Sequence, residues 1–164
     1  MTTSHAEKET LTVDVNIPEH DDRVTTSLFT RTRKALIDRD KCCYISGVET
    51  GLQAHHYPIE RSLAEMIDWE RVKADSLAGE LGLTQAQRNA AKAFDWDAFM
   101  TAAPFDPYAF VDNMLVNGLL LSEPFHIGKD EGIHTLPHPL WIAQRYGLDG
   151  YKFSDVEIIH HQEQ

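Results

Sequence analysis

The chain has 164 residues, and 26 aspartates and glutamates against 15 lysines and arginines give it a formal net charge of −11. An acidic excess argues against a broad nucleic-acid-binding surface, although it does not exclude a local basic patch. No apolar run is long enough to span a bilayer, and residues 1–22 lack the basic start and apolar core of a signal peptide. We therefore expect a cytoplasmic protein.

The two cysteines, Cys42 and Cys43, are adjacent in the sequence. Neighbouring cysteines rarely pair with each other, and four thiolates for a structural zinc are not present. We expect free thiols and no structural zinc.

Residues 1–22 are polar and acidic, and we expect them to form a flexible arm ahead of a single domain over residues 23–164. The domain begins with a predicted helix over residues 27–41, capped by Ser27. This helix carries Arg31, Arg33 and Lys34, in the most basic segment of the chain. Such a run is usually a solvated helix face, and the alternative is a surface that contacts phosphate.

The next segments predict strands and then helices. Residues 42–56 read as two short strands joined by a glycine-containing turn. Apolar residues at helical spacing predict a helix over 59–81 and another over 84–103, the second capped by Thr84. Residues 104–113, with two prolines, read as a loop.

The remaining segments predict an apolar strand at Leu119–Leu121, a loop over 129–137, a short helix over 138–147 and a last strand over 151–159. Strands followed by helices, without regular alternation, indicate an α+β fold.

Histidine placement carries the chemical signal. His55 and His56 end a predicted strand, so their side chains point to opposite faces of it. Asn117 and His126 bracket the later apolar strand. Each residue has an ordinary explanation on its own: a structural histidine, a turn at Asn117-Gly118, a helix start at His126. Their combination suggests a site.

The stretches "CYISGVETGLQAHHYP" and "NGLLLSEPFH" together resemble the HNH endonucleases, also called ββα-metal nucleases. The resemblance is greatest to a branch found in phages and prophages, and it covers most of residues 20–154. It implies an α+β fold with an HNH-like ββα-metal core, flanking helices and a helical insertion at about 60–110. It also implies a phage-infected or prophage-bearing bacterial cell as the setting.

By this resemblance, His55 and His126 would bind one divalent metal ion, His56 would be the general base, and Asn117 would brace the turn that aims His56. The third ligand would be Asp130 or His134, of which we favour His134. Imidazole donors suit zinc, nickel or manganese, and magnesium when oxygen ligands are added. We expect His55 and His126 to share the ion, and His56 to face an open notch beside it.

The implied activity is metal-dependent hydrolysis of DNA phosphodiester bonds. Lys129 and the cations Arg31, Arg33 and Lys34 would contact the substrate. A phage or host protein could bind the helical insertion, which carries Trp69 and Trp96.

The sequence also departs from the family pattern, because only Cys43 remains of the usual cysteine pairs. Ser122 and Phe125 stand where the second pair would be. The acidic charge and this loss favour an alternative: a catalytically weak or inactive HNH scaffold that serves as a binding, accessory or inhibitor module.

Overall fold

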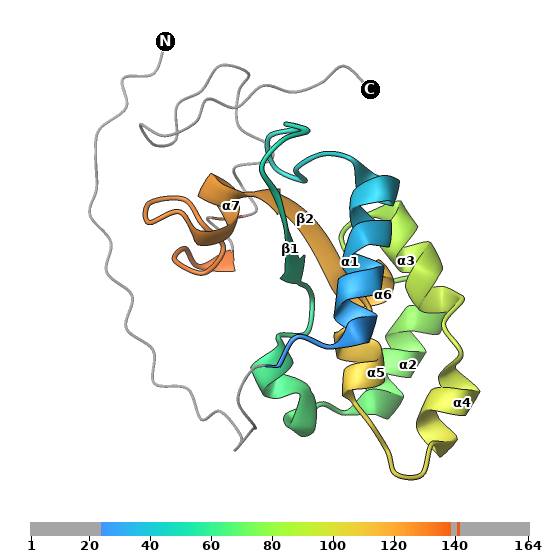
Figure 1. Cartoon of the computed structure of the whole chain (residues 1–164). Coiled ribbons are helices and arrows are strands. Elements are labelled where there is room, and N and C mark those ends of the chain that lie inside the picture. The colour runs from blue at the N-terminus through green and yellow to red at the C-terminus, as the bar shows by residue number, and fades with distance from the viewer. Residues whose placement is uncertain (1–23, 139–140, 142–164) are drawn as a thin grey trace.

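The computed structural model describes residues 24–138 and residue 141 (Figure 1). The expected acidic arm, the expected strand at 151–159 and most of the expected helix at 138–147 lie outside these residues. The described part is an α+β fold in which helices surround a small antiparallel sheet, as the sequence predicted. Among the described helices, none combines the length and apolar character needed to cross a bilayer.

The chain begins with the long helix α1 and then forms β1, a helical region and β2, before the short helix α7. The elements are α1 (Ser27–Asp40), β1 (Leu52–His56), the 3-10 helix η1 (Arg61–Met66), α2 (Trp69–Ala78), α3 (Gln85–Lys92), α4 (Trp96–Thr101), α5 (Tyr108–Val111), α6 (Met114–Asn117), β2 (Gly118–Ser122) and α7 (Glu123–Ile127).

The sheet separates two faces of the molecule. Its register pairs His55 with Leu119 and His56 with Gly118, and paired residues of an antiparallel sheet point to the same side. Leu119 packs with Phe125 of α7, whereas Leu120 packs with helices α1 and α6. Figure 1 shows the strands between α7 and α1, so His55 belongs to the α7 face and His56 to the α1 face.

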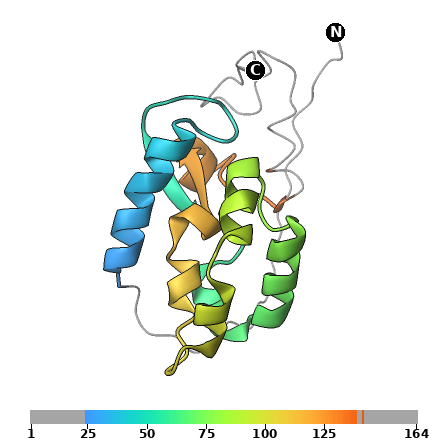
Figure 2. The ribbon, with the colours of Figure 1, turned by 90° about the vertical axis from the view of Figure 1, so that its right-hand side faces the viewer.

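Residues 59–116 form a separate aromatic core. The rings of Trp69, Trp96, Phe99 and Phe110 contact one another, mostly edge to face, and all four side chains are buried. The two tryptophans of the expected insertion are therefore internal packing residues. Seen from the side, α6 lies between α1 and α3 (Figure 2). Helix α6 also contacts both strands and therefore joins this core to the sheet.

Several predicted boundaries were wrong, and the N-cap residues explain the helix errors. The predicted helices over 59–81 and 84–103 each break in two, because Asp68 and Asp95 accept hydrogen bonds from Arg71 N and Ala98 N and so begin new helices at the following tryptophans. Thr84 caps α3 as predicted.

Three shorter segments also differ from the prediction. Thr26, rather than Ser27, caps α1 by accepting from Phe29 N. Residues 42–46 form a turn instead of a first strand, because Gly47 N bonds back to Cys43 O. The predicted loop over 104–113 contains α5, whose first helical residue follows a proline. The predicted strand at Leu119–Leu121 and the irregular segment at 129–137 are confirmed.

Gly118 stands at the junction of α6 and β2, where only a glycine fits. A Cβ added there would lie 2.2 Å from Met114 O. The backbone can therefore turn directly from α6 into β2, which places Asn117 beside the end of β1.

Phe110 is fully buried at the centre of the aromatic core. We expect Phe110→Ala to lower the free energy of unfolding by about 3–5 kcal/mol, because it removes a large side chain that its neighbours cannot replace. Urea denaturation measures this. Leu77→Ala, at a side chain that is 47% exposed, should cost below about 1 kcal/mol; similar losses for both variants would contradict the proposed core.

Candidate functional site

Three histidines meet on the α7 face of the sheet. His55 comes from β1, His126 from α7 and His134 from the segment after α7, and their ligand nitrogens all lie within 4.8 Å of one another. The Nε2 atoms of His126 and His134 are 3.2 Å apart. Asp130, the other candidate for the third ligand, is not in this group.

Local backbone contacts return His134 to His126. A turn closes when Gly132 N bonds to Gly128 O, and Ile133 N and His134 N then bond to the carbonyls of Phe125 and His126. Trp141 fixes the base of this segment, since its indole Nε1 donates to Phe125 O. The chain thus forms a hook that carries His134 over the end of α7.

The geometry fits a divalent metal ion bound by nitrogen. Two nitrogens bound to a tetrahedral zinc at about 2.0–2.1 Å lie about 3.3 Å from each other. The 3.2 Å between the Nε2 atoms of His126 and His134 is close to that separation. His55, His126 and His134 therefore form a group that could hold a metal ion, and their donor set suits zinc or nickel better than magnesium.

Two polar side chains orient the rings of this group. Gln53 Oε1 is 2.7 Å from His126 Nδ1. Since the amide oxygen can only accept a hydrogen bond, Nδ1 carries the proton, and the unprotonated Nε2 is the atom that could bind a metal ion. Glu60 Oε1 lies 3.2 Å from His55 Nε2. Partners of this kind fix the tautomer and direction of ligating histidines.

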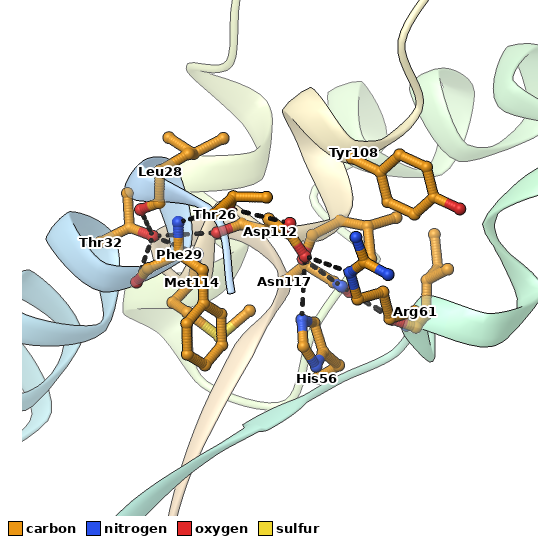
Figure 3. Close-up of polar contacts among 12 residues, drawn as sticks. Thr26, Leu28, Phe29, Thr32, His56, Arg61, Tyr108, Asp112, Met114 and Asn117 are labelled. Carbon is orange, nitrogen blue, oxygen red and sulfur yellow. Dashed lines mark hydrogen bonds and ion pairs between the residues drawn. The ribbon is translucent and has the colours of Figure 1, made fainter. Parts of the chain in front are cut away.

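His56 lies on the other face of β1 and is more enclosed than the sequence predicted. Its side chain is 4% exposed, and its ring stacks on Phe29 of α1 with 5.5 Å between the ring centroids. Its Nε2 atom faces Asp112 Oδ1 at 3.4 Å (Figure 3). The expected open notch is instead a small pocket of about 120 Å³, which His56 lines together with Phe29, Arg61 and Asp112.

Asp112 is the centre of a buried polar network (Figure 3). Oδ1 faces both His56 Nε2 and Arg61 Nε, the latter at 3.3 Å, and Oδ2 accepts from the Thr26 hydroxyl at 2.9 Å. Burial alone would raise the pKa of Asp112, but the contacts with His56 and Thr26 and the charge of Arg61 outweigh it and lower the pKa. Asp112 is therefore an anion at neutral pH.

Asn117 and Gln87 brace the segment that follows His56. The Asn117 side chain accepts from Ile59 N and donates to Ile59 O and Val111 O. Gln87 Nε2 donates to Tyr57 O at 2.6 Å. Both amide side chains are fully buried, so the chain leaves β1 in a fixed direction.

The predicted substrate-binding cations lie at the surface. Arg31, Arg33 and Lys34 are exposed on α1, and Lys129 is exposed directly after α7. None of them lines the pocket beside His56. Arg61 does, although its sequence position inside a predicted helix gave no sign of that role.

No protein-family model, curated protein or solved structure matches this chain. What the site can do is inferred from its own residues.

If the three histidines hold an ion, His126→Ala should weaken zinc or nickel binding by more than the roughly ten- to hundredfold typical of losing an outer partner. Gln53→Leu should weaken it within that range, because it removes only the acceptor that orients His126. Isothermal titration measures both. His138→Ala changes an exposed histidine outside the group and is the control; equal affinity of all four proteins would rule out the site.

The lowered pKa of Asp112 predicts a pH-dependent contribution to stability. The folded pKa lies below the unfolded value of about 3.9, so the contribution is present above that value and is lost as the pH falls through the folded pKa. We expect Asp112→Asn to lower the unfolding free energy by about 2–4 kcal/mol at neutral pH, and the difference from the unmodified protein to shrink as the pH falls below about 4.

Urea denaturation across that pH range is the measurement. Asp97→Asn removes a carboxylate that is 94% exposed and should show little effect at any pH. A loss for Asp112→Asn that stays constant from neutral to acid pH would contradict the ionic role of the group.

Proposed function

We propose that this protein is a metal-dependent endonuclease of the HNH type that hydrolyses DNA phosphodiester bonds. The observation that carries the proposal is the convergence of His55, His126 and His134, beside a neighbouring histidine that is paired with a buried carboxylate. The order β1, β2, α7, with histidines at the end of β1 and on α7, agrees with the resemblance in sequence.

The ion would be held by the three histidine nitrogens. When bound, it would offset the negative charge that develops on a phosphate and on the leaving oxygen during hydrolysis. The protein's part is to aim the rings, through Gln53 for His126 and Glu60 for His55. The same donor set would make zinc or nickel a better candidate than magnesium.

His56 would act as the general base. Its Nε2 faces the anionic Asp112, which favours the tautomer with the proton on Nε2 and leaves Nδ1 to take a proton from water. A carboxylate in this position also stabilises the imidazolium that forms. Asn117 would support this role indirectly by fixing Ile59, three residues after His56.

A substrate would have to reach both faces at the end of β1. His55 and His56 are the last two residues of the strand and project from its opposite sides. A phosphodiester that crosses this end can meet the metal group on one side and His56 on the other. The cations of α1 would guide DNA towards an otherwise acidic protein, with binding that weakens as salt is added.

A second candidate is a metal-binding module without cleavage. It is favoured by the burial of His56, whose side chain is 4% exposed, and by the acidic net charge. In this case the histidine group would stabilise the fold or a contact with another protein, and His56 and Asp112 would form a structural pair.

Nicking of supercoiled plasmid separates the two candidates. The purified protein is incubated with manganese, magnesium, nickel, zinc or a chelator, beside His56→Ala and the control His138→Ala. We expect metal-dependent nicking that His56→Ala lowers by about a hundred- to ten-thousandfold, the usual contribution of a general base, while His138→Ala nicks normally.

Absence of nicking with every metal, while the ion still binds, would support the binding module. Undiminished nicking by His56→Ala would remove the assigned base.

A further inference from the structure

Arg61 pairs with Asp112 at the edge of the pocket that His56 also lines. It begins η1, five residues after His56, and its side chain is 17% exposed. It lines the pocket beside His56 and Asp112. A partly buried arginine beside the proposed base needs a reason, since its charge is expensive to remove from water.

Two contacts fix the plane of the Arg61 guanidinium. Nε lies 3.3 Å from Asp112 Oδ1, and Cζ lies 4.4 Å from the centroid of the Tyr108 ring (Figure 3). These contacts use one edge and one face of the group. Among the residues that the structure describes, none forms a hydrogen bond with the terminal nitrogens Nη1 and Nη2. These two nitrogens form the fork that can bind two oxygens of a phosphate at once.

The pocket can take such a ligand. Its volume of about 120 Å³ is well above the roughly 10–15 Å³ that one water molecule requires. Its polar lining consists of Arg61, Thr25, His56 and the carboxylate of Asp112. Arg61 and Thr25 provide N–H and O–H donors for an oxyanion, whereas Nε2 of His56 faces Asp112. Phe29 also lines it, and Arg33 is exposed one helical turn further along α1, so cations continue from the pocket onto the surface.

We propose that this pocket is a phosphate subsite, in which the Arg61 fork binds a phosphodiester group of the nucleic acid beside His56. Asp112 and Tyr108 are the positioning residues that hold the fork open to the ligand. The inference rests on the proposed function, because it supplies the contact through which a phosphate is kept next to the assigned base. It adds a phosphate contact to those that the sequence predicts at Arg31, Arg33, Lys34 and Lys129.

The test measures binding of a short DNA duplex to the full chain in chelator by fluorescence anisotropy over a range of salt concentrations. Loss of one phosphate contact should reduce the slope of log affinity against log salt by about 0.9. We expect this for Arg61→Met, with at least about a tenfold loss of affinity at low salt. Arg71→Met removes the same charge from an exposed position on α2 and should leave the slope unchanged.

Arg61→Lys guards against misfolding of the methionine variant. It keeps a charge near Asp112 but lacks the planar fork, so its affinity should be lower than that of the unmodified protein at every salt concentration. Thermal unfolding and zinc titration report whether each variant is folded, because the pocket contains none of the three histidines that could bind zinc.

Affinity and slope equal to the unmodified protein in folded Arg61 variants would overturn the subsite, and so would the absence of any duplex binding by the unmodified protein. The result is separable from that of the nicking assay. A protein that never nicks but loses salt dependence with Arg61→Met would keep the phosphate subsite and lose the nuclease.

Discussion

The carboxylate of Asp112 is buried where α1, the end of β1 and the start of η1 meet. A charge in such a place is stable only when cations and donors face it, and Thr26, His56 and Arg61 meet this demand from three different elements. The requirement to neutralise one anion therefore fixes the N-terminus of α1, the ring of His56 and the guanidinium of Arg61 at once. The proposed base and the proposed phosphate contact are oriented by the same group.

Strand β1 divides the chemistry of the molecule in two. Alternation of side chains sends His55 towards α7 and His56 towards α1. The ring of His55 can then enter a cluster of nitrogen donors, while its neighbour lies against a carboxylate, without either residue disturbing the other. Two imidazoles that are adjacent in the sequence have different surroundings because they project from opposite faces of the same strand.

The parts of this arrangement that were predictable from sequence are those that depend on local rules. The opposite directions of His55 and His56 follow from strand geometry, and the cap at Thr84 follows from hydrogen bonding within four residues. The helix breaks at Asp68 and Asp95 had the same kind of signal, an aspartate directly before a tryptophan and an acidic residue, but the continuous helical periodicity concealed it.

The parts that could not be predicted depend on contacts between distant residues. Asp112 lies 56 residues after His56 in the chain and within a segment read as a loop, so no spacing linked them. Arg61 and Gln53 are polar residues with no motif, and only the tertiary structure shows that one lies beside Asp112 and the other beside His126.

The stability of the hook from Gly128 to His134 would depend on the metal ion concentration around the protein. It contains neither helix nor strand and is joined to α7 by few backbone hydrogen bonds. An ion bound by His134 together with His55 and His126 would hold this segment against the rest of the domain. By mass action, an ion at a hundred times its dissociation constant stabilises the folded state by about 2.7 kcal/mol. The concentration of metal in the cell would therefore set how often this segment detaches.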